Sequence, residues 1–169
     1  ERRIRVLHNL SFVEDPTRIL RAVRFEQRLD FVIEERTAQL IDDAMELLDH
    51  VSGERLRNEL YLILREAEPE KSLLRLGQMG VLGHIHPALR FSAESAQMFV
   101  RLRQHLTELA ANGWGRGARA LPELRMCYLA LLTSNMSPDE LETFGHRIRL
   151  TGEDAQFLGE VARLRDVRT

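Results

Sequence analysis

Apolar residues recur along most of this chain at spacings of three and four, which is the period of an amphipathic α-helix. No segment alternates apolar and polar positions convincingly enough to predict a strand. We therefore predict an all-α fold in which the helices form an orthogonal array. The expected helices cover about residues 15–28, 34–49, 52–67, 93–111, 122–132 and 151–167, with shorter helices or turns beginning at 69, 81 and 138.

Capping residues mark the starts of several expected helices. Asp15 suits an N-cap, and Pro16 suits the first helical position because the N–H that it lacks would have no partner there. Ser52 precedes one later helix, and Thr151 begins a capping-box-like start for the last one. Helix positions and their first residues are therefore the most direct structural information in the sequence.

Two segments interrupt the helical pattern. Residues 112–117 combine glycines with polar residues and form the clearest predicted loop. The composition also changes at residues 66–69, where glutamates flank a proline. We place a subdomain boundary there, which gives a first subdomain at 1–66 and a second at 67–169.

The helix expected at 15–28 has two distinct charged faces. Arg18 falls inside the apolar sector of the helical wheel, where a guanidinium needs a partner or a ligand because a buried unpaired charge is costly. Arg21, Arg24 and Arg28 form a compact basic stripe outside that sector. Such a stripe is a candidate RNA-phosphate surface, but it is more often a solvated helix face.

The start of the same helix carries a second notable pattern. Glu14 and Asp15 precede Arg18 by four and three residues, so a carboxylate and a guanidinium can meet on one edge of the helix. Together they offer an acceptor and a forked donor, which the Watson–Crick edge of a base requires. By chemistry alone, the favoured interpretation is an ordinary solvated pair worth a few tenths of a kcal/mol.

Other candidate sites are weaker. Glu54, Arg55 and Glu59 can pair locally at helical spacing, which is typical of a well-capped, salt-bridged helix. The histidines at 84 and 86 lack a neighbouring carboxylate, and no Asp-x-Asp pair occurs, so we predict no metal site in this chain. Cys127 is the single cysteine and lies in an apolar run, which predicts a core residue.

Composition limits the function classes. The formal net charge is −2, so any contact with nucleic acid must come from a local patch rather than from a global field. No apolar stretch has transmembrane length, and no signal-peptide pattern is present. These features and the single cysteine predict a cytoplasmic protein without membrane partners. The chain opens on Glu1, and we expect it to be a piece of a longer protein.

Several of these motifs together resemble one family. Residues 4–6, 11–25 and 29–34 look like the neck of bacterial tRNA nucleotidyltransferases and poly(A) polymerases, the class II CCA-adding and A-adding enzymes. Residues 52–60 resemble a later neck motif, and the segment 76–89 resembles the start of the helical body. The resemblance is specific over roughly the first ninety residues and faint beyond them.

The resemblance implies roles for individual residues. Glu14, Asp15 and Arg18 would read the base of the incoming nucleotide, with Asp15 accepting from the exocyclic amine of ATP or CTP and Arg18 donating to the ring acceptor. Glu14 would help to orient this pair. Arg5 matches an arginine at the end of the preceding nucleotide-binding motif. The last two matches, Arg55 and Glu59, belong to a motif that stabilises the neck.

The resemblance also implies what the chain does not contain. The metal-binding carboxylates of the family belong to a head domain, so no catalytic residue is assigned here, and Mg²⁺ would bind in that missing domain. The complete protein would add nucleotides to the 3′ end of tRNA or another RNA, and this piece alone would be inactive and bind no cofactor. Residues 6–12 further suggest fusion to CBS and DHH-type domains upstream.

Two other interpretations stay open. The chain can be a non-catalytic RNA-binding or scaffolding module of a multidomain protein, or a plain helical interaction domain. Within the enzyme interpretation, the residues do not distinguish CCA addition from A-only addition or polyadenylation, because the same base-reading group can serve each.

Overall fold

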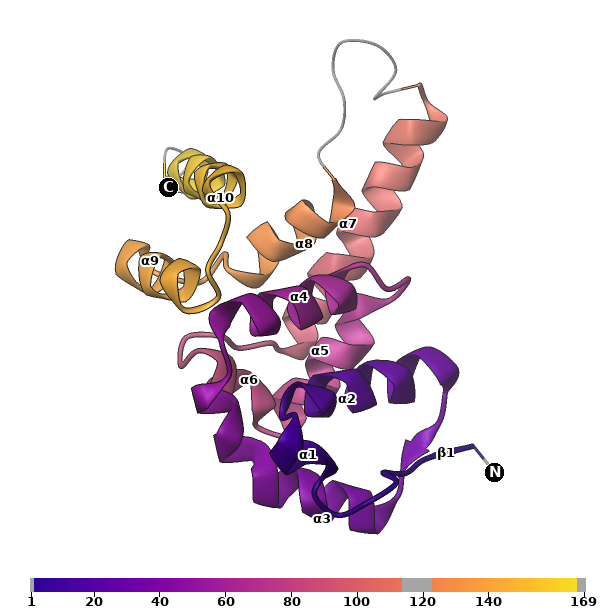
Figure 1. Cartoon of the computed structure of the whole chain (residues 1–169). Coiled ribbons are helices and arrows are strands. Elements are labelled where there is room, and N and C mark those ends of the chain that lie inside the picture. The colour runs from indigo at the N-terminus through magenta and orange to yellow at the C-terminus, as the bar shows by residue number, and fades with distance from the viewer. Residues whose placement is uncertain (1, 114–122, 167–169) are drawn as a thin grey trace.

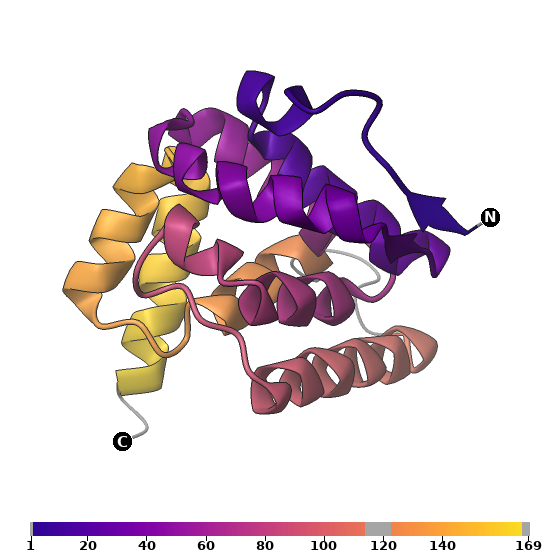
Figure 2. The same cartoon turned by 90° about the horizontal axis from the view of Figure 1, so that it is seen from below.

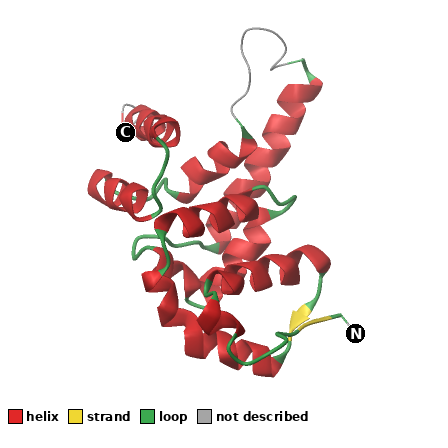
Figure 3. Cartoon of the chain, viewed as in Figure 1, coloured by secondary structure: helices red, strands yellow, loops and turns green. Residues whose placement is uncertain are grey.

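Helices make up most of the computed structural model, which describes residues 2–113 and 123–166. This confirms the prediction of an all-α fold (Figure 3). In chain order the elements are β1 (Arg3–Ile4), α1 (Ser11–Glu14), α2 (Thr17–Leu29), β2 (Val32–Ile33), α3 (Glu35–Ala44), the 3₁₀ helix η1 (Met45–His50), α4 (Gly53–Leu64), α5 (Pro69–Gln78), α6 (Val81–Ile85), α7 (Ala93–Ala111), α8 (Leu124–Leu132), α9 (Pro138–Arg147) and α10 (Gly152–Asp166).

Two short strands depart from the sequence prediction. β1 and β2 pair in parallel, with Arg3 opposite Val32 and Ile4 opposite Ile33. Two residues are too few to show an alternating pattern, so hydrophobic periodicity cannot predict these strands. The pairing ties the first described residues to the end of α2 and the start of α3.

The start of α2 is close to the expected one. The helix begins at Thr17, and Pro16 already has helical dihedral angles of −62° and −22°. Pro16, and not Asp15, is the residue directly before the helix, but the Asp15 carboxylate accepts from the backbone N–H of Thr17 at 3.1 Å and so satisfies a free N–H of the first turn, as an N-cap side chain does. The extra turn α1 directly before it was not expected.

For the other helices, the predicted bounds match the observed bounds in some cases and not in others. The helix expected at 34–49 ends at Ala44 and continues as η1, whereas α7 covers 93–111 as predicted. Ser52 caps α4, and Ser137 and Glu140 form a full capping box at α9. Three predictions lie outside the described residues: the loop beyond Gly113, a helix start at Pro122 and a helix end at Val167.

One hydrophobic core joins the helices. Figure 1 places α2, α4 and α5 at the centre of the molecule, with α9 and α10 on one side and α7 projecting on the other. Figure 2 shows α5 and α6 between the layer of α2 and α3 and the helix α7. The core includes Leu20 of α2, Leu73 of α5 and Leu129 of α8, each fully buried. It extends across the expected boundary at 66–69, which stays a prediction.

Candidate functional site

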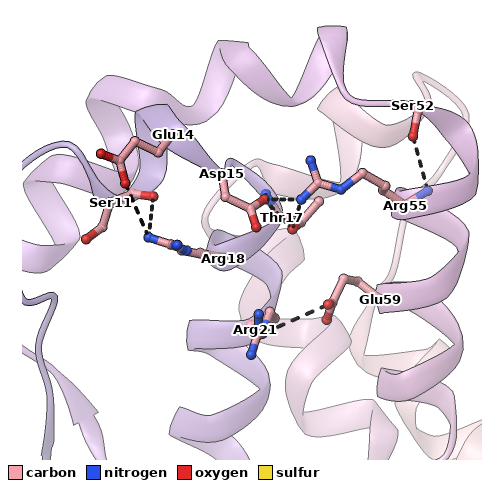
Figure 4. Close-up of polar contacts among 9 residues, drawn as sticks. All are labelled: Ser11, Glu14, Asp15, Thr17, Arg18, Arg21, Ser52, Arg55 and Glu59. Atoms are coloured by element: carbon pink, nitrogen blue, oxygen red, sulfur yellow. Dashed lines mark hydrogen bonds and ion pairs between the residues drawn. The ribbon is translucent and has the colours of Figure 1, made fainter.

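Asp15 lies in the turn between α1 and α2, where three donors fix its carboxylate (Figure 4). The Thr17 hydroxyl donates to Oδ1 at 2.6 Å, and the Thr17 backbone N–H donates to the same oxygen. A guanidinium nitrogen of Arg55, on α4, lies 2.6 Å from Oδ1. None of the hydrogen bonds between Asp15 and the described residues uses Oδ2. The carboxylate is therefore held in place with one oxygen left to accept from a ligand.

The charge state of Asp15 follows from these contacts. Partial burial alone would raise its pKa. The hydrogen bonds from Thr17 and the positive charge of Arg55 outweigh burial, so the pKa of Asp15 lies below its ordinary value of 3.8. Asp15 is therefore an ionised hydrogen-bond acceptor at neutral pH.

Arg18 lies one turn into α2 and faces α1. One of its terminal nitrogens donates to the Ser11 carbonyl at 3.2 Å and lies 3.8 Å from a Glu14 carboxylate oxygen. The predicted Glu14–Arg18 pair is therefore present, whereas Asp15 pairs with Arg55. The Arg18 side chain is 42% exposed, which is more than its place in the apolar sector led us to expect. Its other guanidinium nitrogens make no hydrogen bond with the described residues.

An open pocket adjoins Arg18. Its volume is about 380 Å³, and its lining includes Arg18, the exposed Arg5 and the buried ring of Phe12. The remaining lining residues come from β1, the segment that follows it, the start of α1 and α2, namely Ile4, Val6, Leu7, His8, Ser11 and Ala22. Glu14 and Asp15 do not line it, so the structure brings Arg5 and Arg18 to one pocket. Glu14 lies next to Arg18, whereas the Asp15 carboxylate faces Arg55 (Figure 4).

Arg55 and Glu59 lie on the face of α4 that meets α2. Ser52 caps this helix by accepting from the backbone N–H of Arg55. The local pairs expected within α4 do not involve Arg55, which reaches Asp15, and the Glu59 carboxylate lies 4.0 Å from Arg21. Burial raises the pKa of Glu59 despite the opposing charge of Arg21. Both residues thus connect α4 to α2.

The basic stripe on α2 is only partly a surface. The Arg24 side chain is 10% exposed and lies 3.0 Å from Glu66, so the prediction of a stripe outside the apolar side is wrong for Arg24. The segment after α4, which carries Glu66, covers it. Arg21 and Arg28 are about half-exposed, and Arg28 lies 3.8 Å from the same Glu66 oxygen.

Sequence reasoning missed Thr17 and Glu66. Thr17 follows Asp15 by two residues, and that spacing is typical of an aspartate that accepts from a nearby backbone N–H, so a local signal existed. Glu66 accepts from Arg24, which lies 42 residues earlier in the chain, and no spacing within one helix predicts such a contact.

Three further features of the described residues bear on function. Within residues 2–113 and 123–166, no group of three or more His, Cys, Asp or Glu side chains is placed to hold a metal ion. In the same part of the chain, no helix has both the length and the apolar character needed to span a membrane. Cys127 on α8 is half-buried, and burial raises the pKa of its thiol.

Comparisons with known sequences converge on one family. Residues 30–92 match the model of a probable RNA and SrmB-binding site of polymerase A. An A-adding tRNA nucleotidyltransferase from Geobacter sulfurreducens is 46% identical over 142 residues, which is 83% of this chain and 16% of that protein. A CC-adding tRNA nucleotidyltransferase from the same organism is 40% identical over 57% of this chain and 22% of its own length. The chain therefore spans less than a quarter of each of these two relatives.

Solved structures extend the likeness to almost the whole chain. A CCA-adding enzyme in complex with ATP superposes with a TM-score of 0.80 at 34% identity, covering 98% of this chain and 38% of that one. The Thermotoga maritima CCA-adding enzyme complexed with tRNA superposes with a TM-score of 0.78 at 33% identity, covering 98% of this chain and 39% of that one. The chain belongs to the tRNA nucleotidyltransferase and poly(A) polymerase family.

Proposed function

We propose that this chain is the base-selecting and RNA-holding part of an RNA 3′-end nucleotidyltransferase that performs tRNA CCA or A addition or polyadenylation. The observation that carries the proposal is the arrangement of Asp15 and Arg18. One oxygen of the Asp15 carboxylate is fixed by Thr17 and Arg55 while the other is available, and Arg18 retains unused donors beside a pocket.

The chemistry of selection follows from these two groups. Asp15 Oδ2 accepts from the exocyclic amine of adenine or cytosine, and an Arg18 N–H donates to the adjacent ring nitrogen. Uracil and guanine carry a carbonyl in place of that amine and an N–H in place of the ring acceptor. A carboxylate facing a carbonyl repels it and leaves polar groups unpaired, which disfavours these bases. Glu14 orients Arg18 through the ion pair at 3.8 Å.

Other residues have supporting roles in the proposal. Arg5 extends the positive charge of the pocket towards the triphosphate of ATP or CTP, and the half-exposed Arg21 and Arg28 face RNA phosphate. Arg24 contributes less because it is buried against Glu66. Transfer itself, with Mg²⁺, is assigned to a head domain outside this chain, and the proposal assigns cytoplasmic tRNA processing to the whole protein.

The test uses the intact protein that carries this chain. It is incubated with Mg²⁺, with a tRNA that lacks its 3′ end and with labelled ATP or CTP. We expect labelled nucleotide at the RNA 3′ end, and the length and composition of the added tail distinguish CCA, A-only and poly(A) addition. Salt-sensitive RNA binding without incorporation under any of these conditions would contradict the proposal and favour a non-catalytic RNA-binding module.

A further inference from the structure

The last turn of α9 contacts the segment that begins α4. The Arg147 guanidinium donates to the Val51 carbonyl at 2.9 Å, to the Leu48 carbonyl at 3.0 Å and to the Asp49 carbonyl at 3.3 Å. These oxygens lie at the end of η1 and directly after it, where the end of a helix carries partial negative charge, and the Leu48 carbonyl also accepts from the Val51 N–H. One side chain therefore fixes the whole turn between η1 and α4.

Two more contacts show that the end of α9 and the start of α4 approach each other closely. A Cβ atom on Gly53 would clash with the Arg147 carbonyl oxygen, so the backbones meet at a distance that glycine alone permits. Arg57 on α4 donates to the Arg149 carbonyl just after α9. The two segments are thus joined by contacts in both directions.

The fixed turn leads directly to the candidate site. Ser52 caps α4 immediately after the carbonyls that Arg147 binds, and it accepts from the N–H of Arg55. Arg55 then reaches across to Asp15. Its side chain is 52% exposed, so few neighbours hold it and its position depends on where α4 begins. Figure 1 shows α9 beside the start of α4, and Figure 4 shows Ser52, Arg55 and Asp15 in sequence towards the site.

We propose that Arg147 is a positioning residue for base selection, which acts through the turn at 48–52 and through Arg55 on the Asp15 carboxylate. This inference rests on the proposed function, because it assigns Arg147 to the same selection of ATP or CTP. A contact 96 residues downstream of Val51 then controls how well the Asp15 carboxylate is oriented.

The test compares variants of the intact protein in nucleotide addition to RNA. Arg147→Ala removes all three hydrogen bonds, and Arg147→Lys keeps the charge but replaces the forked donor by a single ammonium group. Arg55→Ala reports the loss of the Asp15 contact directly. Arg101→Ala is the matched control, because Arg101 is an exposed arginine on α7 that makes no hydrogen bond or ion pair with the described residues. The KM for ATP, kcat and the melting temperature are measured for each variant.

We expect Arg147→Ala to raise the KM for ATP about tenfold, with a smaller increase for Arg147→Lys and none for Arg101→Ala. In the Arg55→Ala background, Arg147→Ala should have no further effect on the KM for ATP, because both act through one contact. If Arg147→Ala does not fold, the KM for ATP of Arg147→Lys tests the inference instead.

Two outcomes overturn the inference in distinguishable ways. If Arg147→Ala lowers the melting temperature but leaves the KM for ATP unchanged, or if its effect adds fully to that of Arg55→Ala, then Arg147 only anchors α9. If Arg55→Ala and Asp15→Ala themselves leave the KM for ATP unchanged, the proposed function of the site fails and the inference falls with it.

Discussion

The two oxygens of the Asp15 carboxylate have different surroundings, and this difference is the core of the proposed site. Oδ1 receives Thr17 and Arg55, and Oδ2 is left for a ligand. An acceptor that is already oriented loses less conformational freedom on binding, so selection gains from contacts that never touch the base. Thr17 is only 3% exposed, so it orients the carboxylate from the buried side.

At the same scale, Thr17→Val is the sharpest test of orientation. Valine keeps the shape and the backbone N–H but removes the hydroxyl bond to Asp15, at a cost of about 1 kcal/mol in the free energy of unfolding. We expect the KM for ATP to rise by about threefold to tenfold in the intact protein, in proportion to a lost hydrogen bond of this size. Thr107→Val is the control, since Thr107 is exposed on α7 and, among the described residues, its hydroxyl donates within its own helix, to the Arg103 carbonyl. An unchanged KM for ATP in Thr17→Val contradicts the role of orientation.

The residues also show what local spacing can predict. The bond from the Thr17 N–H to Asp15 and the Glu14–Arg18 pair were predictable from the sequence because both partners lie within about one helical turn. Arg55 was expected to pair within α4, but it pairs with Asp15, 40 residues away. Spacing rules cover neighbours along a helix and contain no information about a second helix, so the contact between Arg55 and Asp15 was not predicted from residue chemistry.

At the level of elements, the junction of η1 and α4 is the critical one. The sequence predicted one helix over 34–49, but the segment changes to a 3₁₀ helix at Met45. The carbonyls at its end are satisfied by Arg147, almost a hundred residues away. A hydrophobic pattern at spacings of three and four does not separate α from 3₁₀ geometry over one turn, and it reveals nothing of a distant donor.

Gly53→Ala tests the closeness of this junction. The added methyl group meets the Arg147 carbonyl, so the backbones must separate, and overpacking of this kind costs about 1–3 kcal/mol. Gly83→Ala in α6 is the control, because a Cβ there meets no atom within 4 Å. We expect a lower urea midpoint for Gly53→Ala and no loss for Gly83→Ala. Equal midpoints for the two variants would contradict the close approach of α9 and α4.

At the scale of the whole molecule, one core connects the site to the C-terminal helices. Buried polar groups also join distant helices, as where Arg103 on α7 donates to both Glu70 and Tyr128. The recognisable motifs lie in about the first ninety residues, but an A-adding relative is 46% identical over 83% of the chain and the structural match covers 98% of it. The later helices present apolar packing positions rather than a recognisable motif, so a single sequence did not reveal that the likeness extends over them.

The central claim is that Asp15 and Arg18 select the base, and the most direct test is the preference of the intact protein for ATP over UTP. The measurement is the ratio of kcat/KM for the two nucleotides on an RNA 3′ end, in the parent protein, in Arg18→Ala and in the Arg101→Ala control. The Arg18 side chain is accessible at 42% exposure, so its removal should leave the fold intact. We predict that Arg18→Ala lowers the ratio about tenfold to hundredfold, while the control keeps it. An unchanged ratio in Arg18→Ala would contradict the account.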